Sequence, residues 1–216
     1  MHKSYVLRTF IYSVCILAIG LVTASVVGIA EEEPARNTQS NEKGGTDQNQ
    51  VSDMEKWKEY ATPNENHKIL DAFVGNWDYT VKWWSSPNSE AEISQGTSET
   101  RWIMGGRFLE QTARGTSMNQ PFEGMGITGY DNAKKEYVSI WIDNMGTGVM
   151  VSNGKYDAST KTFEEKGKFT QPEMGETTFR GVTRIINDER FVYEMYTKDK
   201  DWQEYKALEI TYTRKK

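Results

Sequence analysis

Residues 75–83 read GNWDYTVKW, and large apolar side chains alternate with polar ones along this stretch. One set of alternate positions holds Trp77, Tyr79, Val81 and Trp83, and the positions between them hold Asp78, Thr80 and Lys82. Because successive side chains of a β-strand point to opposite faces, this pattern predicts a strand with one buried face.

Similar stretches follow toward the C-terminus at intervals of about 8 to 12 residues. Turn-forming sequences separate them at 85–88, 105–106, 131–134, 157–160, 187–188 and 198–200. The spacing predicts about ten strands, and no connection is long enough for a crossover helix, so neighbouring strands should pair antiparallel. Closure would remove both exposed edges. The predicted fold class is therefore all-β, a single antiparallel up-and-down β-barrel.

Helical signals precede the first strand. Thr62-Pro63-Asn64-Glu65 predicts a helix start with a capping box and proline at the first helical position. The helix should reach about Phe73, with one apolar face formed by Ile69, Leu70, Phe73 and Val74 that packs against the barrel. A second short helix is predicted over Asp53 to Tyr60.

The first thirty residues form a separate segment. Lys3 and Arg8 precede an apolar run from Phe10 to Ile29, and small residues close it at Gly28-Ile29-Ala30. This order predicts a secretory signal peptide, although the run approaches bilayer-spanning length and also fits a retained N-terminal membrane anchor. Residues 31–52 are polar and predict a disordered linker, so the folded domain should occupy 53–216. We expect an exported protein, periplasmic or extracellular, that meets a membrane only through an uncleaved leader.

Several kinds of site are excluded by composition. The only cysteine, Cys15, lies in the leader, and His67 is the one histidine outside it. Disulfides, thiolate metal sites and multi-histidine metal sites are therefore not expected, and neither is a cofactor. The net charge of −5 argues against nucleic acid as a partner. His67 is interpreted as a solvated helix residue rather than a general base.

Two features resemble the lipocalin (calycin) group. Gly75-Asn76-Trp77 is similar to the GxW sequence that opens the first lipocalin strand, and Arg214 ends the last predicted strand. The resemblance implies that Arg214 packs over Trp77 and closes one end of the barrel.

A closer resemblance, from His67 to Arg214, is to the DUF1579 family of uncharacterised bacterial proteins. It is carried by LDAFVGNW at 70–77, WIMGGRFL at 102–109, FEGMGITGYD at 122–131, YVSIWID at 137–143 and LEITYTR at 208–214. This resemblance implies a lipocalin-like barrel with a ligand cavity and implies no activity.

Candidate cavity residues come from the aromatic strand positions: Trp77, Tyr79, Trp102, Tyr130 and Trp141. Asp143 shares a strand face with Trp141, so it is either a polar group of the cavity or the start of the following turn. Arg107 could hold the head group of a fatty acid, or it could lie at a solvated edge. Gly124 to Gly129 match GxGxxG, but no helix follows, so the glycines are interpreted as structural.

Three functions remain open. The leading hypothesis is a binding module for a small apolar or amphipathic molecule, which predicts a cavity. The alternative is a hydrolase or isomerase that uses carboxylate, Arg or Tyr groups, which predicts a carboxylate inside the cavity with a raised pKa. The third is an envelope interaction protein, which predicts an exposed apolar patch. No catalytic residue is assigned.

Overall fold

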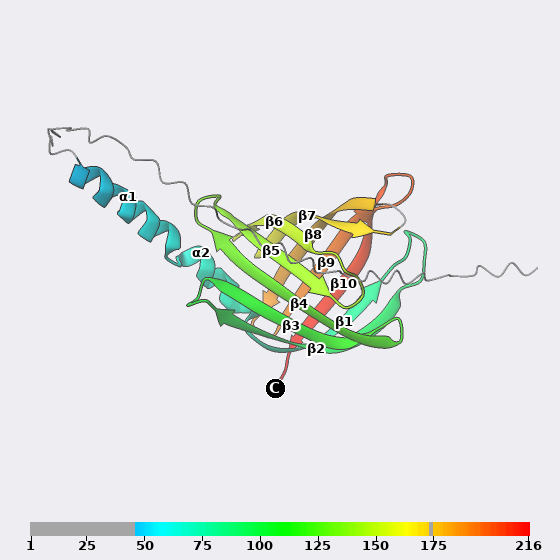
Figure 1. The fold of residues 1–216 in the computed structure, drawn as a ribbon. Coiled ribbons are helices and arrows are strands. Elements are labelled where there is room, and N and C mark those ends of the chain that lie inside the picture. Colours follow the sequence, from blue (N-terminus) through cyan, green and yellow to red (C-terminus); the bar gives the residue numbers. More distant parts are fainter. Residues whose placement is uncertain (1–45, 173–174) are drawn as a thin grey trace, which may run out of the picture. The chain divides into compact units, whose positions relative to one another are not determined.

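A closed β-barrel forms the body of the protein. The computed structural model describes residues 46–172 and 175–216, and within these ranges it contains ten strands (Figure 1). They are β1 Gly75–Trp83, β2 Glu92–Ile103, β3 Phe108–Ser117, β4 Gln120–Asp131, β5 Glu136–Asp143, β6 Met150–Asp157, β7 Thr162–Gln171, β8 Gly175–Asn187, β9 Arg190–Lys198 and β10 Glu204–Arg214. Each strand pairs antiparallel with the next along the chain.

Closure comes from pairing between the first and last strands. β1 pairs with β10 from Trp77 opposite Arg214 to Trp83 opposite Leu208, and with β2 along its other edge. The predicted all-β, antiparallel up-and-down barrel is confirmed. Since every strand has two neighbours, no row of unpaired backbone groups is left at an edge of this sheet.

The predicted turns, including the alternative turn after Asp143, lie at connections between strands, but two further connections carried no recognised turn signal. One of them joins β3 to β4 through Met118 and Asn119, whose φ angles are 50° and 59°. Two successive positive φ angles are typical of a two-residue type I′ hairpin, in which Asn-Gly is the usual sequence. The sequence did not predict this turn because methionine stands at its first position.

The helix α1, Thr46–Ala61, begins earlier than the predicted start at Asp53, so the last residues of the predicted linker are helical instead. Residues 51–61 are exposed throughout, and they include Val51, Met54, Trp57 and Tyr60 at helical spacing, so the apolar side chains of α1 are not buried. The leader and the remainder of the predicted linker lie outside the described residues. Within the described ranges, the helices are too short or too polar to cross a bilayer.

The predicted helix before β1 forms, with a different start and ending. Its N-cap is Asn64, not Thr62, and α2, Glu65–Lys68, continues as the 3-10 helix η1, Ile69–Phe73. Asn64 Oδ1 accepts from the Asn66 backbone N–H at 2.9 Å, and the Asn64 N–H donates to Nδ1 of His67 at 3.1 Å. The interpretation of His67 as solvated is wrong, because its side chain completes this capping box and is only 5% exposed.

The segment α2–η1 covers one end of the barrel, which we call the helix end (Figure 1). Leu70 is 1% exposed, and the Phe73 ring packs against Phe163 and Phe191 at centroid distances of 5.4 and 5.0 Å. Below it, Trp77 Nε1 donates to the Phe73 carbonyl at 2.9 Å. These contacts close the helix end with packed side chains.

Candidate functional site

A cavity of about 940 Å³ occupies the barrel interior, and every one of the ten strands contributes to its wall. Leu70 and Phe73 bound it at the helix end. At the opposite end it reaches Met118, Asn119 and Met145, which lie in or beside connections between strands. Its volume lies within the range of about 300 to 1,000 Å³ that is usual for small-molecule sites.

Three of the proposed cavity residues line this space: Tyr79, Trp141 and Asp143. The Trp141 ring lies against Gly124 and Gly126 of β4, where an added Cβ would approach it to 2.4 and 3.0 Å. Two glycines of the GxGxxG stretch thus give the indole its place on the wall. The stretch itself runs within β4, which agrees with the structural interpretation of its glycines.

Asp143 fulfils both alternatives that the sequence left open, since it lines the cavity and also begins the following turn. Its Oδ2 accepts from Trp141 Nε1 at 2.8 Å, and its Oδ1 accepts from the Met145 backbone N–H at 2.9 Å. The carboxylate therefore starts the turn after β5 and also fixes the orientation of a cavity indole.

Three aromatic candidates do not line the cavity and pack at the helix end instead. Trp77 is fully buried in the core beneath it. Trp102 donates through Nε1 to Asp71 at 2.7 Å, and Tyr130 packs edge-on against His67 and Tyr137 at 5.8 and 5.0 Å. Strand alternation places these rings on the inner face, but α2–η1 fills the barrel at their depth.

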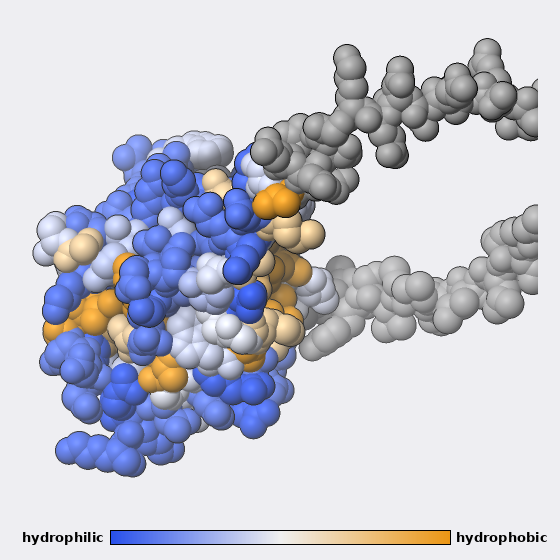
Figure 2. Space-filling model, turned by 90° about the vertical axis from the view of Figure 1, so that its left-hand side faces the viewer, coloured by the Kyte–Doolittle hydropathy of each residue, from blue (hydrophilic) through white to orange (hydrophobic). Residues whose placement is uncertain are grey.

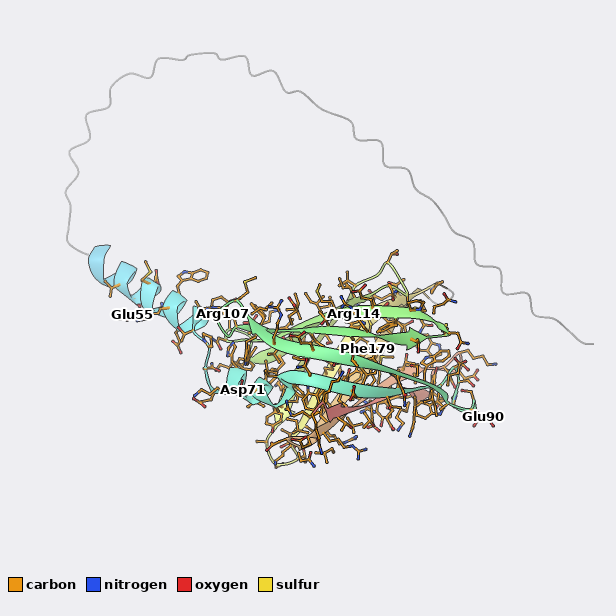
Figure 3. The ribbon with its side chains drawn as sticks, turned by 90° about the horizontal axis from the view of Figure 1, so that it is seen from below. Glu55, Asp71, Glu90, Arg107, Arg114 and Phe179 are labelled. Carbon is orange, nitrogen blue, oxygen red and sulfur yellow. The ribbon has the colours of Figure 1, made fainter. Side chains whose placement is uncertain are left out.

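Arg107 also lies away from the cavity. It sits in the turn between β2 and β3, where its Nη1 donates to the Met104 carbonyl at 3.1 Å. Figure 3 shows it at the same end of the barrel as Asp71, with Glu90 at the other end. Arg107 therefore cannot hold a head group inside the barrel.

The arginine of the last strand lies where the lipocalin resemblance implied. Its guanidinium carbon is 4.2 Å from the Trp77 ring centroid. Nη1 of Arg214 donates to the Val74 carbonyl at 2.8 Å, and Nε donates to the Asp188 carbonyl at 2.7 Å. This contact is structural, since it lies at the helix end.

A carboxylate that the sequence analysis missed projects into the cavity. Glu165 is an inward residue of β7, and its Oε2 accepts from Ser152 Oγ on β6 at 2.8 Å. The Tyr193 hydroxyl on β9 lies beside it. Burial raises the pKa of Glu165, and these two polar neighbours only partly oppose that rise. Burial likewise raises the pKa of Tyr193 well above its ordinary value.

A signal for Glu165 exists in the sequence. Along β7, the inward positions hold Phe163, Glu165, Gly167 and Phe169, so the glutamate interrupts an otherwise aromatic and small-residue face. Its cross-strand partners are both glycines, Gly154 and Gly181. An isolated acid on a face of this kind is a candidate polar group of the cavity.

The charged groups of the cavity wall are all acidic. Among the described lining residues there is no lysine, arginine or histidine, and the acidic side chains belong to Glu92, Asp143, Glu164 and Glu165. Residues 46–172 and 175–216 also contain no cluster of three or more potential metal ligands.

The outer face of the barrel carries apolar residues on β4, β5 and β6. Met125 pairs with Ile142, and Ile140 pairs with Val151, and these four side chains are 36–46% exposed. Hydrophilic side chains dominate the face seen in Figure 2, and hydrophobic ones cover a smaller part of it.

Comparisons with known proteins agree with this architecture. The family model described as "Protein of unknown function (DUF1579)" matches residues 62–214, and no curated protein matches the sequence. The crystal structure of Rv2717c from M. tuberculosis superposes with a TM-score of 0.55 at 11% identity, covering 72% of this chain and 100% of that one. A redesigned β-barrel gives a TM-score of 0.37 at 16% identity, covering 68% and 96% of the two chains. The similarity to Rv2717c shows the fold alone.

Proposed function

The chain belongs to the DUF1579 family of proteins of unknown function, and from its own barrel we propose that it binds a small apolar or amphipathic molecule. The observation that carries this proposal is the cavity of about 940 Å³, which lies between a packed helix end and the loops of the opposite end. A barrel filled by its own side chains would have no such space.

The wall has the composition of a small-molecule site. Aromatic and aliphatic side chains such as Phe122, Phe179 and Ile210 supply apolar surface. Fixed polar groups interrupt it, among them the Thr128 and Ser139 hydroxyls, which are 2.9 Å apart. Pockets of this kind bury a ligand against apolar walls and orient it through a few hydrogen bonds.

We also propose that the protein acts outside the cytoplasm. The basic and apolar leader supports an exported protein, either released or anchored at its N-terminus. Fractionation of the native cells, with N-terminal sequencing of the mature chain, tests this directly. A chain that begins at Met1 and stays with the cytosolic fraction would contradict it.

Native mass spectrometry of the protein purified from its own cells tests ligand binding. We expect an added mass that disappears on denaturation and that identifies the ligand class. Ser139→Phe, which fills the cavity, should abolish the added mass. Val138→Phe should retain it, because Val138 is the adjacent residue on the opposite face of β5 and does not line the cavity. Loss of the ligand in both variants, or in neither, would contradict a site inside the barrel.

The position of Glu165 also supports a second candidate, an enzyme that works by general acid–base catalysis. A carboxyl group whose pKa burial has raised, with a tyrosine hydroxyl beside it, is a candidate to give and accept a proton in catalysis. Incubation of the captured molecule with fresh protein distinguishes the two functions. Conversion that Glu165→Gln abolishes would establish the enzyme, and unchanged mass would leave the binding function.

A further inference from the structure

We propose that Glu165 anchors the head group of the ligand, and that this ligand is a lipophilic amine whose protonated nitrogen meets the carboxylate while its apolar part fills the cavity. This inference rests on the proposed binding function and specifies its ligand class.

The surroundings of Glu165 keep its carboxylate accessible from the cavity. A Cβ built on Gly181 would lie 2.5 Å from Glu165 Oε1, and a Cβ built on Gly154 would lie 2.9 Å from the Glu165 Cβ. Both cross-strand neighbours therefore have to be glycines for the side chain to lie as it does. The wall makes room for this carboxylate.

The hydrogen bonds of Glu165 leave acceptor capacity for a ligand. An ionised carboxylate offers about four acceptor positions on its two oxygens. Within the described residues, the Ser152 hydroxyl donates one hydrogen bond to it, and the Tyr193 hydroxyl lies beside it. A primary ammonium group carries three N–H donors and can use the remaining positions.

The charge of the wall favours a cation. A buried carboxylate normally has a basic partner, yet the described lining residues include no lysine, arginine or histidine. An anionic ligand would meet acids alone, whereas a cationic one would provide the missing partner. We therefore replace the earlier alternative, a fatty acid held by Arg107, with a ligand of opposite charge held by Glu165.

Three probes of equal chain length separate the head group from the tail. Decylamine, decanol and decanoate are titrated into the delipidated full chain at pH 7.5 by isothermal calorimetry. Decylamine should bind at least tenfold more tightly than decanol, and decanoate should bind most weakly. Decanol also reports on the proposed function itself, because it requires only the apolar cavity.

Two variants and a pH series test whether the preference for decylamine depends on the Glu165 carboxylate. Glu165→Gln should weaken decylamine at least tenfold and change decanol less than twofold. Glu99→Gln, which removes an exposed acid on the outer face of β2, should change neither. In the unmodified protein, decylamine affinity should fall as acid protonates Glu165, while decanol affinity stays constant. This series decides the question even if Glu165→Gln does not fold.

The outcomes also separate the two proposals. If decanol binds but decylamine binds no more tightly, or if neither Glu165→Gln nor acid weakens decylamine, the amine assignment is overturned and the binding function stands. If none of the three probes binds, both are overturned.

Discussion

Arg214 and Trp77 face each other across the seam between the last strand and the first, with the guanidinium carbon 4.2 Å from the centre of the indole ring. The same guanidinium donates to the carbonyls of Val74, just before β1, and Asp188, in the β8–β9 turn. One side chain thus joins three segments that are far apart in sequence, at the end where the barrel is packed.

Arg214→Ala should therefore destabilise the fold by about 3 kcal/mol, since it removes a cation–π contact and two hydrogen bonds from a charged donor. Arg214→Lys should cost less stability than Arg214→Ala but more than none, because an ammonium group cannot donate to both carbonyls and also stack on the indole as a planar guanidinium does. Urea unfolding measures both. Lys215→Ala, next along the chain and exposed, should cost less than about 0.5 kcal/mol, and an equal cost for the two alanine variants would refute the role of Arg214.

Gly75 makes the same contact possible. Its φ angle is +133°, and a Cβ at this position would lie 2.4 Å from Arg214 Nη1. Gly75→Ala should cost about 2 kcal/mol, because the backbone conformation is strained for alanine and the guanidinium must move. Gly148→Ala is the matched control, since nothing lies within 4 Å of its added Cβ and its φ is ordinary. A difference of less than about 0.5 kcal/mol between the two in thermal unfolding would show that the seam tolerates the methyl group.

The sequence predicts the barrel because alternation is a local property. The alternation of Trp77, Tyr79 and Val81 predicts an inner face without reference to the neighbouring strands. The position of Arg214 opposite Trp77 follows from the lipocalin resemblance. Closure follows from the number of strands and the liability of open edges. These parts of the structure require no long-range information.

Depth along the barrel is a different matter. Trp102 and Tyr130 have the alternation of cavity residues, yet α2–η1 packs against the end of the barrel where they lie. The inward residues that line the cavity are those that α2–η1 does not contact. The sequence of a single strand does not predict where this helical segment packs. Glu165 was missed for the related reason that charge is usually assigned to the outer face, whereas its glycine partners are visible only once the strand register is known.

His67 should make stability depend on pH. Burial, and then the positive charge of Arg107, lower the pKa of His67 below its ordinary value of 6.5. Because the folded state disfavours the protonated ring, stability is complete above pH 6.5 and is lost as the pH falls through the lowered pKa.

His67→Gln removes this titration while keeping a side chain that can reach the Asn64 N–H of the capping box. Between pH 7.5 and 5.5 the variant should lose less stability to urea than the unmodified protein. Parallel losses in the two proteins over this interval would show that the pKa of His67 is the same in the folded and unfolded states.

Glu165 should have the opposite linkage. Because burial raises its pKa above the ordinary 4.5, the folded state holds the proton to a higher pH than the unfolded chain does. The contribution of this group to stability is therefore complete below pH 4.5 and is lost as the pH rises through the raised pKa. Glu165→Gln removes the ionisation, so the variant's melting temperature relative to the unmodified protein should increase from pH 4.5 to pH 8. Glu99→Gln, on the exposed face of β2, should show a constant difference over the same range. If the Glu165→Gln difference were also constant, or decreased with pH, the carboxylate would be fully ionised in the folded barrel at little cost, and the need for a cationic partner in the cavity would disappear.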